Sequence, residues 1–140
     1  QYTKSGSAPI KAAARGESTV GIVFMHDAVK QAVAGFPISV VAPCEGTGFE
    51  IGSMSIIDGA RNEDSAKAFY DWALTTDAQN LALEVNAFQV PSNASSDTSP
   101  AAPNMDDIKL IDYDFTLYGS SDERRRLLSK WDEEISTLPQ

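Results

Sequence analysis

Four residues with small or hydroxyl-bearing side chains stand before an alanine-rich run near the start of the chain: Thr3, Ser5, Gly6 and Ser7. The run over residues 10–15 predicts a helix. Ser7 is a favourable N-cap, and Pro9 suits a first turn, where a missing N–H costs little. Backbone N–H groups, hydroxyls and the positive end of the helix dipole then converge, which suits an oxyanion such as phosphate. The alternative is a capped surface helix that binds nothing.

A histidine and a carboxylate follow the first predicted strand. The apolar, β-branched run over residues 19–24 predicts a buried strand, and His26 and Asp27 come soon after it. Ligands of open α/β folds bind outside the carboxyl ends of parallel strands, so this pair could hydrogen-bond the hydroxyls of a polar ligand. The alternative is that Asp27 N-caps the next helix and His26 is an ordinary surface residue.

A turn with two glycines forms a third candidate, over residues 43–50. Its glycines let the backbone approach a ligand closely. Glu45 or Glu50 could accept hydrogen bonds from sugar hydroxyls, and Phe49 could stack on an apolar sugar face. The alternative is an ordinary connecting turn.

Other chemistries find little support in the residue types. One histidine, one cysteine (Cys44) and scattered carboxylates make no zinc pattern, so we predict no metal and no cofactor. Neither a Gly-x-Ser-x-Gly elbow nor a P-loop is present, although Ser7 with His26 stays open as a nucleophile and base. We expect a binding protein rather than an enzyme, with a phosphate-ester hydrolase as the alternative.

Helices and strands alternate over the first 43 residues, which predicts an α/β layer with a largely parallel sheet. Helices are predicted over 10–15 and 27–34, and buried strands over 19–24 and 38–42. The alternation places the hydroxyl-rich turn and the His26–Asp27 pair at the ends of neighbouring elements.

The rest of the chain predicts one extended segment, a loop and three helices. The extended segment covers residues 49–57, and an amphipathic helix follows over 63–74 with Asn62 as its cap. A capping box at Thr76 opens the next helix, and residues 91–107 predict an exposed, mobile loop. Ser120 and Glu123 form a capping box for a last helix, whose predicted buried face is Leu127, Leu128, Trp131, Ile135 and Leu138.

The charge of the chain limits the kinds of partner that it can bind. The 140 residues carry a net charge of −9 and no basic face, which argues against nucleic acid and against an anionic membrane surface. A helix end can still bind a small anion in an acidic protein. The chain opens on Gln1 without a methionine, and we expect a processed or truncated piece.

Several segments together resemble a known family. They are residues 2–9, 15–17 and 20–23, the run Val-Ala-Pro-Cys-Glu-Gly-Thr-Gly over 41–48, the run over 52–62 that ends Gly-Ala-Arg-Asn, and residues 76–80 and 90–93. This combination resembles the periplasmic solute-binding proteins of the type II, iron(III)-ABC-transporter-like group. The resemblance implies an α/β fold of two lobes, of which residues 1–43 form part of the second. Residues 44–140 are then the return crossover, a first-lobe strand and C-terminal helices, with the mobile loop 91–107.

The resemblance also implies a ligand. Ferric-binding members carry two adjacent tyrosines where this chain has Met25, His26 and Asp27, so Fe(III) held by phenolates is not expected. The sequence is closer to the AfuA-like branch, which binds hexose phosphates such as glucose 6-phosphate. There, a His-Asp pair and a glutamate hold the sugar, matched by His26, Asp27 and Glu50, with Glu45 as the alternative glutamate. The phosphate loop is matched by Thr3, Ser5, Gly6 and Ser7.

Family members are longer, so the resemblance implies pieces of both lobes and only half of the cleft. It implies a periplasmic binding component that delivers an anionic ligand to an inner-membrane ABC permease. Phosphonate, inorganic phosphate and a ferric iron complex remain alternative ligands. An orphaned crossover strand favours dimerisation or segment swapping.

Overall fold

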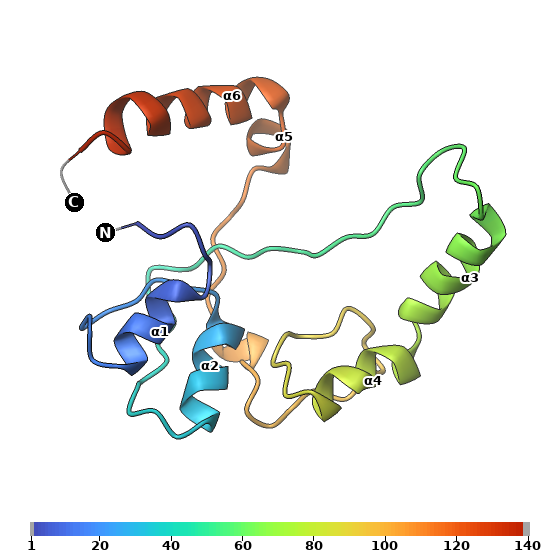
Figure 1. Ribbon diagram of the computed structural model, residues 1–140, viewed down its shortest axis with the longest axis horizontal. Helices are drawn as coiled ribbons and strands as arrows, with labels where there is room; N and C mark the ends of the chain where they lie inside the picture. Colours follow the sequence, from blue (N-terminus) through green and yellow to red (C-terminus); the bar gives the residue numbers. More distant parts are fainter. Residues whose placement is uncertain (1, 139–140) are drawn as a thin grey trace.

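The computed structural model describes residues 2–138. The first residue of the predicted segment 1–43 and the last two residues of the predicted segment 44–140 lie outside the described residues. Figure 1 shows short helices joined by long extended traces rather than a closed body. The helices are α1 (Ala8–Ala14), α2 (Met25–Val33), α3 (Glu63–Ala73), α4 (Thr76–Glu84), the 3₁₀ turn η1 (Met105–Asp107), α5 (Phe115–Tyr118), α6 (Ser121–Lys130) and the π-helical turn η2 (Trp131–Ile135).

The predicted strands are extended but unpaired. Within residues 2–138 the only ladder-type contact is one isolated parallel bridge between Thr47 and Leu110. Residues 20–24 and 38–43 have extended backbone with no neighbouring strand, and Ile22 is 91% exposed. The prediction of buried strands over 19–24 and 38–42 is therefore wrong for this chain taken alone. A strand needs a partner on its edge and a layer on its face, and the described chain supplies neither.

Local sequence signals place most helices correctly. Ser120 accepts a hydrogen bond from the Glu123 N–H, as its capping box predicts. At α4 the cap is Thr75, one residue before the predicted Thr76, and its hydroxyl oxygen accepts from the Ala78 N–H. Asn62 occupies the N-cap position of α3 but makes no side-chain capping bond.

The core is small and centres on the first two helices. Five hydrophobic residues are buried in the described chain, and four of them belong to α1 and α2: Ile10, Ala14, Ala28 and Val29, with Phe88 as the fifth. Ile10 and Ala14 are four residues apart and so share one face of α1. The two helices contact each other, as Figure 1 shows. The pair of α1 and α2 is therefore where most of the buried hydrophobic residues of the described chain lie.

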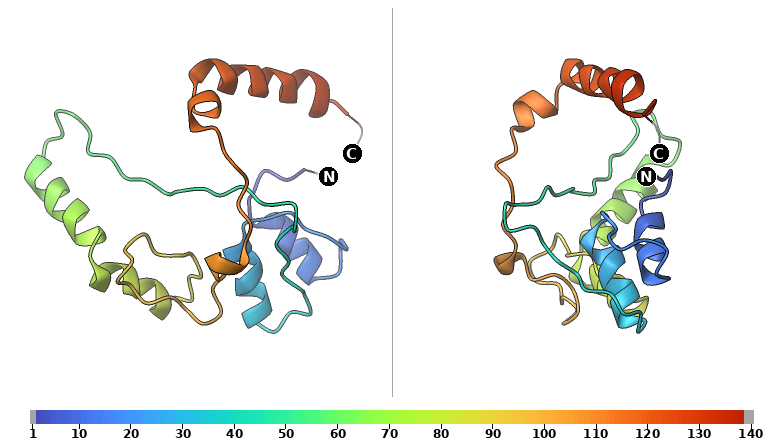
Figure 2. Two further views of the ribbon diagram at one scale, coloured as in Figure 1. Left: turned by 180° about the vertical axis from the view of Figure 1, so that it is seen from behind. Right: turned by 90° about the vertical axis from the view of Figure 1, so that its left-hand side faces the viewer.

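The C-terminal helices leave their apolar faces open. The predicted buried face of the last helix is wrong for this chain alone, because Leu127 and Leu128 are exposed and Trp131 is 38% exposed. Its ring meets Tyr2 edge-on, with centroids 4.6 Å apart. Figures 1 and 2 show α6 standing away from the other helices, with only α5 and η2 beside it. Phe69 on α3 is likewise exposed.

Amide side chains tie the loop after α4 to that helix. Gln79 Nε2 donates to the Ser92 hydroxyl at 3.0 Å, and Gln79 Oε1 accepts from the Asn93 N–H at 2.9 Å. Asn80 makes a matching pair of bonds with Asp97, one to its carboxylate and one from its N–H. The start of the loop is thus fixed by side chains that lie 13 to 17 residues earlier.

Gln79→Ala should loosen this loop. The change removes the Ser92 and Asn93 bonds, each contributing about 1 kcal/mol. We expect faster amide exchange at Asn93 and earlier protease cleavage within 91–107, with the rest of α4 unchanged. Glu84→Ala is the matched control on the exposed end of the same helix. Equal cleavage rates in both variants would contradict the role given to Gln79.

Candidate functional site

The hydroxyl-rich turn leads directly into α1. Residues 4–7 form a bend and turn, and the helix begins at Ala8 with Pro9 in its first turn. Ser7 stands at the N-cap position but has helical backbone angles (φ −95°, ψ −3°) and makes no side-chain capping bond, so its predicted capping role is wrong. The Thr3 hydroxyl donates to the Ser5 carbonyl at 2.9 Å. The Ser7 hydroxyl is thus not engaged in a cap, and the turn is largely open to solvent.

His26 and Asp27 lie in the first turn of α2. The helix begins at Met25, after Phe24 at the N-cap, so Asp27 is not the cap of this helix. A carboxylate at this position interacts favourably with the helix dipole. His26 Nε2 lies 3.9 Å from Asp27 Oδ1, and the imidazole stacks on the Phe24 ring at a centroid distance of 5.6 Å. Both side chains are about 30% exposed, so their polar atoms reach solvent.

Gly21 connects these two helix starts. A Cβ at this position would lie 2.9 Å from the Pro9 carbonyl oxygen, closer than real side chains come. The extended segment 20–24 therefore runs tightly past the first turn of α1 on its way into α2. Figures 1 and 2 show the two helices side by side, both entered from the same end. The predicted phosphate turn and the His26–Asp27 pair thus share one end of one helix pair.

The two glutamates lie on a different part of the chain, where two long extended segments cross. The Thr47 N–H donates to the Lys109 carbonyl at 2.9 Å, and the Ile111 N–H donates to the Thr47 carbonyl at 3.0 Å. Gly46 has φ +122°, and a Cβ there would lie 3.3 Å from the Ile111 side chain. A glycine is required here because the backbone conformation and the close neighbour both disfavour a side chain.

Glu45 is held as a carboxylate at this crossing. Its own backbone N–H and the Cys44 thiol, which donates at 3.4 Å, lower the pKa of Glu45. An ionised carboxylate accepts hydrogen bonds and donates none, which suits contact with hydroxyl groups. Both Glu45 and Glu50 are exposed.

Comparison with solved structures identifies the relatives of this chain. Over 99% of its length it matches the periplasmic binding protein AfuA from Actinobacillus pleuropneumoniae, solved with exogenous fructose 6-phosphate bound, at 50% identity and a TM-score of 0.90. The periplasmic binding protein P5PA matches 96% of it at 38% identity and a TM-score of 0.85. The chain is homologous to AfuA-type periplasmic binding proteins. The resemblance predicted from its sequence motifs is confirmed.

The match to AfuA covers only part of that protein. This chain spans 44% of AfuA and 43% of P5PA. An uncharacterized protein of Haemophilus influenzae is 46% identical over 136 residues, which are 96% of this chain and 39% of that protein. No family model matches the sequence. AfuA-type proteins have the type II α/β fold, which supports the predicted fold class for the whole protein, whereas the chain itself holds helices and unpaired extended segments.

An aromatic cluster beside the crossing was not predicted as a unit. Phe49 meets Phe115 edge-on at a centroid distance of 5.9 Å, and Tyr113 meets Phe115 at 5.0 Å and Tyr118 at 5.3 Å. The sequence singled out only Phe49, because its partners lie more than 60 residues later. The four rings of this cluster are 39% to 62% exposed, and Phe49 is next in sequence to Glu50.

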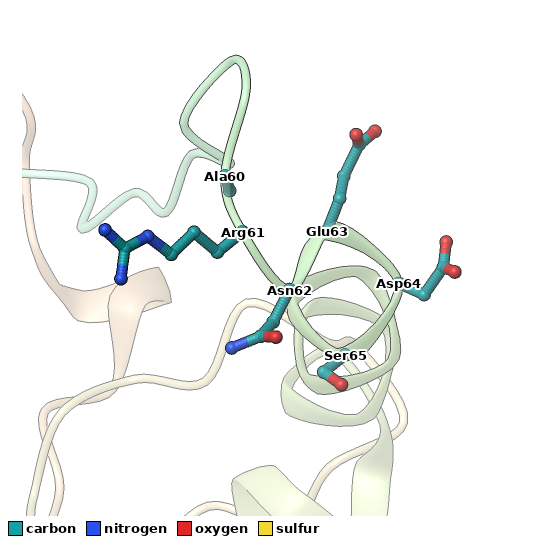
Figure 3. Close-up of a pocket in the computed structure, with 6 residues that line it drawn as sticks. All are labelled: Ala60, Arg61, Asn62, Glu63, Asp64 and Ser65. Carbon is teal, nitrogen blue, oxygen red and sulfur yellow. The ribbon is translucent and has the colours of Figure 1, made fainter.

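A polar hollow at the start of α3 lies outside this arrangement. Figure 3 shows its lining residues, Ala60, Arg61, Asn62, Glu63, Asp64 and Ser65. The Arg61 side chain points away from Glu63 and Asp64, so the charged groups do not converge on one point. Among residues 2–138 no cluster of three metal-ligating side chains occurs, and none of the described helices has the length and apolar character to cross a membrane.

Proposed function

We propose that this chain forms part of a periplasmic solute-binding protein and supplies one side of a cleft that captures a phosphorylated sugar. The observation that carries the proposal is the match to AfuA, which was solved with fructose 6-phosphate bound, across 99% of this chain. The proposal includes a periplasmic location and delivery of the ligand to an ABC permease of the inner membrane. No covalent chemistry is required of the chain.

The turn before α1 is proposed to hold the phosphate. Thr3, Ser5, Gly6 and Ser7 offer hydroxyls and backbone N–H groups next to the positive end of the helix. The absence of a side-chain cap on α1 supports this role, because the Ser7 hydroxyl is not committed to a capping bond. The Ala8 N–H already donates to the Ser5 carbonyl at 3.2 Å and Pro9 has no N–H, so the hydroxyls and the N–H groups of the turn itself would be the main donors to a phosphate.

His26 and Asp27 are proposed to hydrogen-bond the hydroxyl groups of the sugar. Their ring nitrogen and carboxylate stand at the start of the helix that packs on α1, and both are partly exposed. Glu50, with Glu45 as the alternative, would be the third residue that accepts hydrogen bonds from the sugar hydroxyls, and it would come from the proposed crossover. Two lobes that close by a hinge would bring the crossover toward the helix pair.

Replacing His26 or Asp27 by alanine should weaken binding of the sugar phosphate. In a chimera where this chain replaces its matching segment of AfuA, we expect a loss of about 1–3 kcal/mol, or about 5-fold to 150-fold in Kd, from lost and orphaned hydrogen bonds. Isothermal titration calorimetry with fructose 6-phosphate and glucose 6-phosphate measures it. Lys30→Ala, an exposed change on the same helix, is the control. An unchanged Kd would reject the assignment of these residues.

The same chimera separates the alternatives. A thermal-shift response to phosphonate, inorganic phosphate or ferric citrate, without one to hexose phosphates, would replace the proposed ligand. Release of inorganic phosphate from a sugar phosphate, abolished by Ser7→Ala or His26→Ala, would indicate a hydrolase instead. Stoichiometric binding without turnover is the result that we expect.

A further inference from the structure

Phe24 lies directly before the turn of α2 that carries His26 and Asp27, and it has no role in the site proposed above. Its ring stacks on the His26 imidazole, with centroids 5.6 Å apart and an angle of 16° between the ring planes. Aromatic pairs at such centroid distances attract each other beyond the area that they bury. Phe24 is nevertheless 49% exposed, so core packing explains its position only in part. Its contact with the imidazole is the feature that points to a role.

The backbone of Phe24 is held on both sides. Its carbonyl accepts hydrogen bonds from the Asp27 N–H at 3.1 Å and from the Ala28 N–H at 3.3 Å, which ties it to the first turn of α2. Three residues earlier, Gly21 passes the Pro9 carbonyl so closely that a Cβ would lie 2.9 Å from its oxygen. The residue is thus placed between the two helices, and its ring offers the imidazole a surface with a defined position.

Stacking limits how the imidazole can meet a ligand. Because Phe24 covers one face of the ring, the nitrogens act from its edge. His26 Nε2 lies 3.9 Å from Asp27 Oδ1, which is too far for a direct hydrogen bond but less than two hydrogen-bond lengths. A single hydroxyl between the two atoms could accept from Nε2–H and donate to the carboxylate. Both side chains are about 30% exposed, so a hydroxyl can reach them from solvent.

We infer that Phe24 is a positioning residue, whose ring holds the His26 imidazole so that Nε2 and the Asp27 carboxylate bind the same sugar hydroxyl. The inference rests on the proposed function, because it takes this pair as the group that contacts the sugar. Without the ring, the imidazole could turn about its side-chain bonds, and ligand binding would have to order it. Phe24 therefore raises affinity through His26 rather than through a contact of its own.

The first test is calorimetry with fructose 6-phosphate in the AfuA chimera. Phe24→Ala should raise Kd about 3-fold to 10-fold, the factor that an aromatic pair contributes. Phe24→Tyr keeps a ring and should retain the affinity, whereas Phe24→Leu keeps only apolar bulk and should lose it. In a His26→Ala background, Phe24→Ala should change Kd less than about 2-fold, because the imidazole that it orients is gone. Phe36→Ala, an exposed phenylalanine beyond the other end of α2, is the control.

The second test needs no ligand. His26 is the only histidine among the 140 residues, so its ring protons give the only imidazole signals in a proton NMR spectrum of the chain. A stacked aromatic ring moves such signals upfield. At one fixed pH, we expect the upfield position in the unaltered chain and in Phe24→Tyr, and its loss in Phe24→Ala and Phe24→Leu.

Each result decides a separate point. Equal imidazole shifts in the chain and in Phe24→Ala, or an unchanged Kd in that variant, would overturn the inference. The same loss of affinity with and without His26 would overturn it too, since Phe24 would then act on the ligand or on the fold directly. If the unaltered chimera binds no sugar phosphate, the proposed function fails, and the imidazole shifts still decide whether Phe24 holds the ring.

Discussion

Ile10→Ala should separate α1 from α2 and remove most of the stability of this helix pair. Ile10 is 6% exposed and is the largest side chain among the four buried residues of α1 and α2. Truncating a buried isoleucine to alanine costs about 2–5 kcal/mol. A complete small domain has only about 5–15 kcal/mol of stability, and this chain has a far smaller core than such a domain.

The measurement is urea unfolding followed by far-UV circular dichroism, with amide exchange to locate the effect. We expect exchange to accelerate throughout α1 and α2 while α6, whose contacts among the described helices are with α5 and η2, is unchanged. Lys11→Ala, at the exposed neighbouring position, is the control. A loss below about 1 kcal/mol would mean that the burial of Ile10 contributes little to the stability of the helix pair.

The importance of one residue follows from what the rest of the chain lacks. Long apolar segments such as 50–57 contribute almost no burial here, although their composition is typical of strands. Hydrophobic stabilisation scales with apolar area removed from water, so an exposed isoleucine adds nothing until a partner covers it. These segments can therefore add stability only where another polypeptide surface covers them.

Sequence reasoning succeeded where the cause of a structure is local. The start of α6 follows from Ser120 and Glu123, because the Ser120 hydroxyl accepts a hydrogen bond from the Glu123 N–H. It failed for residues 19–24, because periodicity shows that a segment prefers burial but not whether a partner strand lies in the same chain. The family resemblance was predicted from several short motifs taken together, because no single motif identifies the family.

The candidate site was predictable in part for the same reason. Ser7 and Pro9 mark a helix start, and the structure places one there, but the course of residues 20–24 past Pro9 is a tertiary contact. The bonds of Gln79 with Ser92 and Asn93 are equally invisible to local patterns, since a glutamine side chain has many possible partners. The roles of the site residues stay predictions that the chimera tests.

Gly21→Val should damage both the helix pair and ligand binding. Valine favours extended backbone, so by propensity alone it should strengthen the segment 20–24. Its Cβ would nevertheless meet the Pro9 carbonyl oxygen at 2.9 Å and the Ile10 nitrogen at 3.4 Å. Backbone atoms cannot rotate away as a flexible side chain can, so the segment must move off α1, at a cost of about 3 kcal/mol.

The displaced segment leads directly into His26 and Asp27, so the pair that we propose to contact the sugar would shift relative to the turn before α1. We therefore expect a lower free energy of unfolding for the chain and a weaker sugar phosphate affinity in the AfuA chimera. Gly52→Val is the matched control, because a Cβ at Gly52 meets nothing within 4 Å in a segment that is also extended. If both valines behave alike, the contact of Gly21 with Pro9 does not set the spacing of the site.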